Sequence, residues 1–517
     1  MPIRCSIIYA KKLDFFRRYC IIDVEGKKIG GNEMKEINIG KSRQVFWDNY
    51  LIDEEKTSAE LRVNPPVKKE CIFEFDQPNE TFSISYPCIL KDDKGYKMYY
   101  QPWYESGFAP CVCVVESEDG LHWRRPHLDI FDGLDIEENN IVIDRVKDGI
   151  FVFYDTNPAC PIDEKYKAIG PAKILHPDGE EKTSLCCFFS PDGYHFTLSH
   201  PMTRYGTFDS LNTAMWDGEK YVCFFRSFHN LPDTPNDKPL TMNEIYHFGG
   251  KIVNAATRDI RVMYSDDFYT WSTPELIKFD DGLDYPLYTN NIEIYGRAPI
   301  FVGFPVRYCE RPEWTANIEQ MASYKIKKAA TERIEARTGR VSTDCIFMCS
   351  HDGKTWHRYN EAFLSPGYED EHNWIYGDCY LAYGMIDSGR EYYNLYTIDR
   401  HFSFGYARPL NRYEIRKDGF ACIAAGGDER VVTTKPIIFD GDALHLNFET
   451  SAYGYIYVSV LDENGNIISS GESVEVFGNT IDRRVVFGDF DIGSLAGKPV
   501  TLKFRMRDAK MYSMWFE

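Results

Sequence analysis

Short apolar runs dominate the chain, and they come in pairs separated by turn residues. "YPCILKDDKGYKMYYQ" (86–101) places two apolar and aromatic runs on either side of an Asp-Asp-Lys-Gly turn. The same form returns in "NTAMWDGEKYVCFFR" (212–226) and in "NNIEIYGRAPIFVGFP" (290–305). Runs of this length around a turn predict β-hairpins, whereas the spacing typical of long helices is nearly absent. We therefore expect an all-β protein.

A second pattern consists of a serine, an aspartate two residues later and an aromatic residue six positions after the serine. Its copies are "SEDGLHW" from Ser117, "SPDGYHF" from Ser190, "SDDFYTW" from Ser265 and "SHDGKTW" from Ser350. A weaker copy, "RKDGFAC", contains Asp418 and Phe420. We expect each copy to turn the chain between the two outer strands of a repeated unit and to pack its aromatic residue on the next sheet.

Four clear units and one degenerate unit over residues 70–425 predict a five-bladed β-propeller. Residues 1–69, with "INIGKSRQVFWDNYLID", are expected to supply a strand that closes the ring. Residues 312–339 contain good helix formers and predict a helical insertion, which is either a solvated helix, a lid or a subunit contact. The alternating strands of residues 430–517 predict an antiparallel β-sandwich, as a structural support or a carbohydrate-binding module.

Composition narrows the classes of partner. The 517 residues carry a formal net charge of −20 and show no compensating basic stripe, so nucleic acid and anionic membranes are not expected partners. The N-terminal apolar stretch is too short and too often interrupted by charges for a signal peptide or a membrane span. The 15 cysteines lack zinc-ligand spacing and favour a reducing compartment, so we expect a cytoplasmic protein. The sequence leaves open whether the protein forms a homo-oligomer.

Propeller ligands bind at the central depression, so we searched for polar residues at the first strand of each unit. The five units offer Asp76 and Glu80; Asp155 and Asn157; Asp209 and Asn212; Tyr288, Asn290 and Asn291; and Asp370, Glu371, Trp374 and Asp378. Glycoside cleavage needs one carboxyl group to protonate the leaving oxygen and another to attack or to activate water. Asp155 and Asp209 are the first candidates for this pair, and Glu80 and Asp48 follow. The expected sugar-binding residues are Asn157, Asn212, Tyr288, Asn290, Arg258, Arg307 and Trp374.

Each candidate also has a structural interpretation. Asp155, Asp209 and Asp48 could be turn residues, and Glu80 could be an ordinary loop residue. Arg258 and Arg307 could form structural ion pairs, and Trp374 could belong to the core. The sequence contains no Gly-rich phosphate loop, G-x-S-x-G elbow, H-E-x-x-H motif or metal-ligand spacing, so we expect neither a cofactor nor a metal.

Several stretches resemble bacterial proteins described as glycosyl hydrolase family 32 N-terminal-domain-like, whose architecture is related to families 43 and 32. They include "FWDNYLID", "FYDTNP", "RDIRVMYSDDFYTWSTPELI" and "GKPVTLKFRMRDAKMYSMWF". The resemblance implies a five-bladed propeller of glycosidase type. It carries over no catalytic residue and no fructan specificity, because "RDI" at Arg258 lacks the proline of the family's R-D-P motif, Glu70-Cys71 comes too early for its E-C motif, and W-M-N-D-P-N-G is absent.

Residues and resemblance together predict a glycoside hydrolase-like enzyme that acts on an oligosaccharide or glycoside. Two alternatives stay open. One is a non-catalytic carbohydrate-binding propeller, and the other is a metal-assisted lyase or esterase that acts on carbohydrate.

Overall fold

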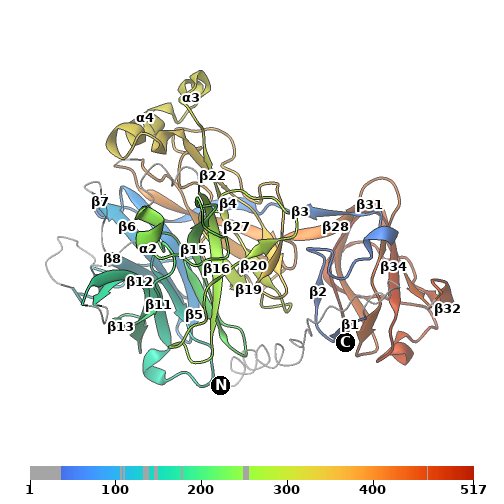
Figure 1. Ribbon diagram of the computed structural model, residues 1–517. Helices are drawn as coiled ribbons and strands as arrows, with labels where there is room; N and C mark the ends of the chain where they lie inside the picture. The colour runs from blue at the N-terminus through green and yellow to red at the C-terminus, as the bar shows by residue number, and fades with distance from the viewer. Residues whose placement is uncertain are drawn as a thin grey trace.

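Five four- or five-stranded sheets form a ring in the computed structural model, next to a separate C-terminal sheet domain (Figure 1). The structure describes residues 36–517 except 105–106, 109–110, 132–138, 145–148, 176–178, 248–255, 404 and 463. The N-terminal apolar stretch lies outside these residues. The predicted all-β class and the five-bladed propeller are confirmed.

Each blade is antiparallel, apart from the parallel pair β18–β24 in blade IV. Blade I contains β5 (Ser83–Asp92), β6 (Gly95–Tyr104), β7 (Gly107–Phe108), β8 (Cys111–Ser117) and β9 (Ile141–Asp144). Blade II contains β10 (Phe151–Tyr154), β11 (Tyr166–Leu175), β12 (Glu181–Ser190) and β13 (Thr197–Thr203). Blade III contains β14 (Thr213–Trp216), β15 (Tyr221–His229), β16 (Thr257–Ser265) and β17 (Glu275–Leu276). Blade IV contains β19 (Ile292–Ile294), β20 (Phe301–Gly303), β23 (Met348–Ser350), β24 (Thr355–Arg358) and β18 (Lys278–Phe279).

Blade V is completed by a strand from the beginning of the propeller. It contains β25 (Ile386–Asp387), β26 (Tyr392–Ile398), β27 (Arg408–Arg416) and β4 (Val67–Phe75). β4 pairs with β27 and so closes the ring. The segment 37–53, which we expected in this role, instead pairs with the C-terminal domain, because β1 (Ile37–Gly40) lies along β30 (Ile437–Phe439) and β2 (Gln44–Val45) along β34 (Thr501–Phe516).

The repeated Ser-x-Asp pattern forms the same turn in four blades. In blade IV, the Ser350 hydroxyl accepts a hydrogen bond from the Gly353 amide at 2.9 Å, and the Trp356 indole donates to the Gly353 carbonyl at 3.1 Å. Asp352 accepts from the amide of Thr355 at 2.7 Å. The local hydrogen bonds explain why the pattern recurs where each third strand ends, as the sequence predicted.

The fifth copy does turn the chain where β27 ends, because the Gly419 amide donates to the Arg416 carbonyl at 2.9 Å. The chain then enters β28 (Ala421–Ala425) of the C-terminal sheet, so the copy does not join two outer strands of a blade as predicted. Asp418 is fully buried, and its carboxylate accepts hydrogen bonds from Arg297 at 2.8 Å, Tyr295 at 2.7 Å and Ser513 at 2.7 Å. Arg43 adds an ion pair at 3.1 Å. Asp418 therefore joins blade IV to the C-terminal domain.

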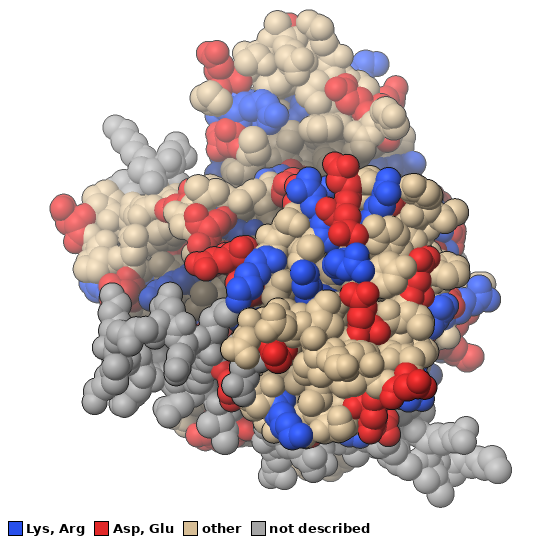
Figure 2. Space-filling model, turned by 90° about the vertical axis from the view of Figure 1, so that its right-hand side faces the viewer, with Lys and Arg blue, Asp and Glu red and all other residues tan. Residues whose placement is uncertain are grey.

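The C-terminal domain is built on two long antiparallel strands, β31 (Leu444–Leu461) and β34. Their register shifts between Thr450 and Tyr455, and one buried apolar core lies against them. Its strands form one eight-stranded sheet and, separately, the two-stranded pair of β1 and β30, and the two-layered sandwich stays a prediction. Its outer face carries charges of both signs side by side (Figure 2). The other strands are β3 (Glu60–Val63), β28 (Ala421–Ala425), β29 (Arg430–Thr433), β32 (Ile467–Glu472) and β33 (Asn479–Arg484).

The predicted helical insertion projects from blade IV on a two-stranded ribbon of β21 (Val306–Glu310) and β22 (Val341–Cys345). It consists of two helices, α3 (Ala316–Gln320) and α4 (Tyr324–Arg333), at the top of Figure 1. A further short helix in blade III, α2 (Met242–His247), has no counterpart in our sequence analysis. Within the described residues, no helix is both long and apolar enough to span a membrane. Short 3-10 turns cover Glu54–Lys56, Ile162–Glu164, Thr338–Arg340 and Ile492–Leu495.

Candidate functional site

The starts of neighbouring inner strands meet at one end of the ring. The side chain of Asn212, before β14, donates to the carbonyl of Gly149, before β10, at 3.4 Å. Thr213 donates to the carbonyl of Asn290 at 3.4 Å, and Asn291 donates to that of Leu381 at 3.0 Å. Residues that precede the inner strands therefore gather at this end, which we call the entry face.

Asp155 lies at the opposite end of the ring, because it follows β10 rather than preceding it. Its buried carboxylate bonds to the Lys167 ammonium at 3.0 Å and to the Tyr221 hydroxyl at 2.7 Å. Asn157 donates to the same hydroxyl at 3.0 Å. The predicted pair of Asp155 and Asp209 is thus not brought together, and Asn157 does not reach the entry face.

Glu80 and Asp48 are held in structural networks. Glu80 precedes β5 but is fully buried, and it bonds to Tyr100 at 2.5 Å and to Arg125 at 2.7 Å. Asp48 lies beside the outer turn of blade IV, 3.1 Å from His351. Burial acts to raise the pKa of Asp48, but the charge and hydrogen bond of His351 outweigh it and lower the pKa. Neither carboxylate faces a shared substrate position.

Asp209 is the predicted carboxylate that does lie at the entry face with access to solvent. Its side chain is 41% exposed and accepts from Nη1 of Arg226 at 2.7 Å. Its backbone carbonyl accepts from the hydroxyl of Tyr86, which comes from the first blade, at 3.3 Å. Two blades thereby fix the loop that carries this carboxylate.

A cluster of four tyrosines lies beside Arg226, the partner of Asp209. The Arg226 guanidinium lies 4.8 Å from the ring centre of Tyr288. The Tyr288 hydroxyl lies 2.6 Å from that of Tyr376, and its ring is stacked on Tyr308 with centres 5.7 Å apart. Tyr380 lies 6.2 Å away, centre to centre. Aromatic faces of this kind match the apolar faces of sugar rings, and the hydroxyl groups supply hydrogen bonds.

The two predicted arginines have different environments. Arg307 is held by both carboxylate oxygens of Asp344, at 2.7 and 2.6 Å, which is a structural ion pair. Arg258 is only 8% exposed, and its guanidinium lies 4.3 Å from the ring centre of Tyr308. Burial, followed by the positive charge of Arg226, lowers the pKa of Arg258.

Among the asparagines of the entry face, one has a structural role and others have no hydrogen-bond partner among the described residues. Asn212 uses its amide group to bond three backbone carbonyls, so it organises the strand starts. Asn290 is 1% exposed, and among the described residues neither its side-chain nitrogen nor its oxygen has a hydrogen-bond partner. The same is true of Asn79, before β5. Because buried amides are normally paired, these two are candidate ligand contacts. Trp374 donates to the Gly367 carbonyl at 2.9 Å and stays part of its own loop.

A cavity of 460 Å³ lies between the 362–379 loop and the outer strands of blade V, β4 and β27. Asp378 and Asp399 both line it, with Tyr413 and His372. Burial raises the pKa of Asp378 well above its usual range, although the backbone amide of Ile375 donates to its carboxyl at 2.9 Å. A carboxyl group with a raised pKa keeps its proton near neutral pH and can act as an acid.

Sequence reasoning missed several members of this site. Arg226 ends the apolar run "YVCFFR" on a second strand, whereas our search covered first strands alone. Tyr308 lies on the ribbon that carries the helical insertion, and Tyr376 and Tyr380 flank Asp378 in a loop. The one usable signal was the density of tyrosines around "YTNN" and "WIYGDCY".

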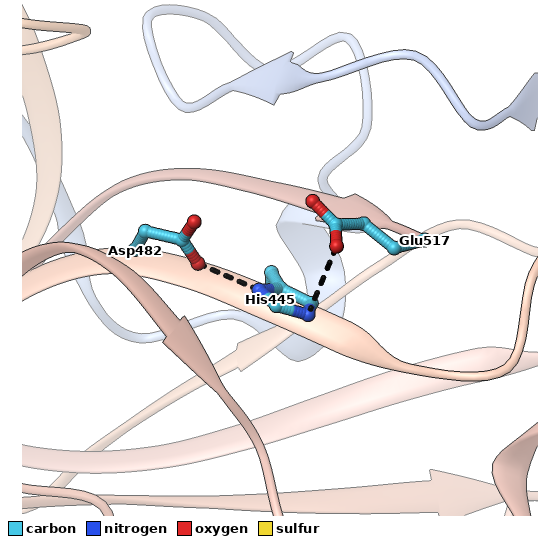
Figure 3. A group of neighbouring side chains, drawn as sticks. All are labelled: His445, Asp482 and Glu517. Carbon is cyan, nitrogen blue, oxygen red and sulfur yellow. Dashed lines mark hydrogen bonds and ion pairs between the residues drawn. The ribbon is translucent and has the colours of Figure 1, made fainter.

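Away from the propeller, three side chains of the C-terminal domain form a group with metal-ligand chemistry (Figure 3). His445 lies 2.6 Å from Asp482 through Nδ1 and 3.7 Å from Glu517 through Nε2. Both ring nitrogens thus already face carboxylates, and both acids are exposed. The arrangement is that of a surface ion-pair network.

Comparison with known proteins gives structural likenesses only. No protein-family model and no curated protein matches the sequence. A solved structure of an N-acetylgalactosamine deacetylase from F. plautii, in complex with blood group B trisaccharide, is 12% identical with a TM-score of 0.36, covering 89% of this chain and 95% of that one. A GH32 beta-fructofuranosidase of Bombyx mori is 10% identical with a TM-score of 0.36, covering 88% and 94%. An alpha-L-arabinofuranosidase of Fusarium graminearum is 11% identical with a TM-score of 0.35, covering 70% and 98%.

The GH32 family that the sequence resembles is thus represented among these structures. At such identities and TM-scores, the likenesses carry no argument about the activity of this chain. The functional argument rests on its own side chains.

Proposed function

We propose that the protein binds a carbohydrate at the entry face and cleaves a glycosidic bond there. The observation that carries this proposal is the position of Asp209, a solvent-accessible carboxylate fixed by Arg226 beside four tyrosines. An accessible carboxylate next to aromatic faces is the combination that sugar binding and glycosidic cleavage need.

The proposed roles follow from the two kinds of carboxyl group. Asp209, which pairs with Arg226, serves as the carboxylate that attacks the anomeric carbon or activates water. Asp378, with its raised pKa, serves as the proton donor to the leaving oxygen. Tyr288 contacts Arg226, the partner of Asp209, and also Tyr380, which comes two residues after Asp378. The buried amides of Asn290 and Asn79 bind sugar hydroxyls.

A release assay tests the proposal. Purified protein is incubated with aryl glycosides and oligosaccharides, and product is compared for wild type, Asp209→Asn and Asp217→Asn. Asp217 is the matched control, because it follows β14 at the far end of the strand, whereas Asp209 precedes it at the entry face. Loss of release in folded Asp209→Asn but not in Asp217→Asn supports the assignment. Wild-type release by Asp209→Asn contradicts it.

A non-catalytic carbohydrate-binding propeller is the second candidate. The structural fixation of Asp48, Glu80 and Asp155 favours it, because it removes three of the four carboxylates expected to do chemistry. This candidate predicts saturable sugar binding without product from any glycoside. We also propose a reducing compartment such as the cytoplasm, since all 13 described cysteines are free thiols.

A further inference from the structure

Arg258 is a buried cation that pairs with no carboxylate in the part of the chain that the structure describes. It is 8% exposed, and its side chain makes no hydrogen bond or ion pair with any residue that the structure describes. Its Nε is enclosed without an acceptor. Burying an arginine without an acceptor is costly, because ring faces attract the charge but accept none of the five N–H donors in the usual way.

The neighbouring arginines show that this is specific to Arg258. Arg226 is paired with Asp209 at 2.7 Å, and Arg337, from the helical insertion, with Glu335 at 2.7 Å. Both lower the pKa of Arg258 after burial itself, because like charges oppose one another. Among the described residues, these three arginines therefore carry one positive charge more than their carboxylate partners offset, within a chain of net charge −20.

The aromatic rings around Arg258 restrict the shape of a ligand that could bind its guanidinium group. Tyr308, Tyr288 and Phe228 place ring centres 4.3, 5.8 and 5.8 Å from its guanidinium carbon. A guanidinium between aromatic rings offers its edge, and a planar carboxylate can accept two parallel hydrogen bonds from that edge. A tetrahedral phosphate matches such a slot less well.

We propose that Arg258 binds the carboxylate of an acidic sugar, so that the ligand of this site is a uronic acid or a uronic-acid-containing glycoside. The inference rests on the carbohydrate site proposed above and specifies its substrate class. The tyrosine cluster contacts the ring of the acidic sugar, and Arg258 neutralises its charge.

The test compares ligands that differ only at one carbon. Affinities of the full-length protein for methyl β-glucuronide and methyl β-glucoside, and for the matching galacturonide and galactoside, are measured by calorimetry. We expect at least a ten-fold preference for the acidic member of at least one pair. Equal affinity within both pairs, or tighter binding of glucose 6-phosphate than of either uronide, overturns the inference.

Two variants locate the preference. Arg258→Gln is expected to bind the acidic and neutral members equally, and Arg258→Lys, which keeps the charge but loses the fork, to retain a reduced preference. Arg412→Gln is the control, since Arg412 pairs with Glu70 on the outer strands of blade V. An unchanged preference in folded Arg258→Gln overturns the assignment. Because binding is measured without turnover, wild-type protein that releases product but shows no preference for the acidic sugar rejects this inference alone, whereas uronide binding without any release rejects only the proposed catalysis.

Discussion

The ammonium of Lys167 lies 3.0 Å from the carboxylate of Asp155, and both side chains are buried at the end of blade II that faces away from the candidate site. Burial alone acts to lower the pKa of Lys167, and the charge of Asp155 outweighs this and raises it. The Asp155 carboxylate, paired with a buried ammonium group, therefore has a structural role.

Replacing Asp155 by asparagine is therefore expected to reduce stability rather than chemistry. Removing one member of a buried ion pair costs about 3 kcal/mol, because the remaining charge is left without its partner. Urea denaturation measures this loss, and sugar binding by the folded variant should match that of wild type. The double variant Asp155→Asn/Lys167→Met should recover part of the stability. A folded Asp155→Asn protein of wild-type stability would contradict the structural role.

A second prediction concerns the glycine of the repeated turn. Gly193 has φ +81°, and a Cβ there would lie 2.7 Å from the Tyr99 hydroxyl and 2.9 Å from the Tyr166 ring. Gly353 occupies the same turn position with φ +73°, but a Cβ there meets only ordinary contacts from 3.5 Å. Gly193→Ala should therefore cost roughly 1–3 kcal/mol more than Gly353→Ala, because the backbone strain is shared and the clash is not. Equal losses in denaturant unfolding would contradict this.

A third prediction links pH to the contact between propeller and C-terminal domain. Burial opposes the charged form of Asp418, but Arg43 and Arg297 outweigh it and hold its pKa well below the usual range. Its ionised form therefore stabilises the fold above the unfolded pKa of about 4, and that contribution is lost as the pH falls from there toward the folded pKa. The stability difference between wild type and Asp418→Asn should shrink below about pH 4 in urea titrations. A pH-independent difference would reject this linkage.

The fourth prediction concerns the proposed proton donor. Burial raises the pKa of Asp378, so product release should be highest while this carboxyl is protonated and should fall as the pH rises through its pKa. Asp378→Asn should lower release at least 100-fold and remove this alkaline limb. Asp399→Asn, on the same cavity, should keep the limb if Asp378 is its source. An unaltered profile in Asp378→Asn would assign the acid elsewhere.

The sequence was informative about the blades because their signals are local. The hydrogen bonds of a Ser-x-Asp turn lie within six residues, so Ser117, Ser190, Ser265 and Ser350 could be interpreted directly. The apparent fifth copy shares only an Asp-Gly pair, and the partners of Asp418 come from residues far away in the chain. Nothing within its own neighbourhood shows that this turn aspartate is buried against residues from other parts of the chain.

The candidate site was predicted less well, since direction along a strand decides which end a residue occupies. Asp155 and Asp209 both adjoin short inner strands, yet one follows its strand and the other precedes it. Arg258 and Arg307 looked equivalent, and only the position of Asp344 on a distant strand separates them. Such differences arise from contacts between residues far apart in the chain, and a short sequence motif contains no information about them.

The pairing of β4 with β27 has a consequence for how the molecule is made. Residues 67–75 leave the ribosome long before residues 408–416, which are their partners in the last blade. Until synthesis reaches that blade, an edge strand with a hydrogen-bonding backbone has no neighbour, and such edges invite pairing with other chains. Blade V can therefore be completed only after β27 has been synthesised, and until then the first propeller strand of the nascent chain, β4, stays without its partner.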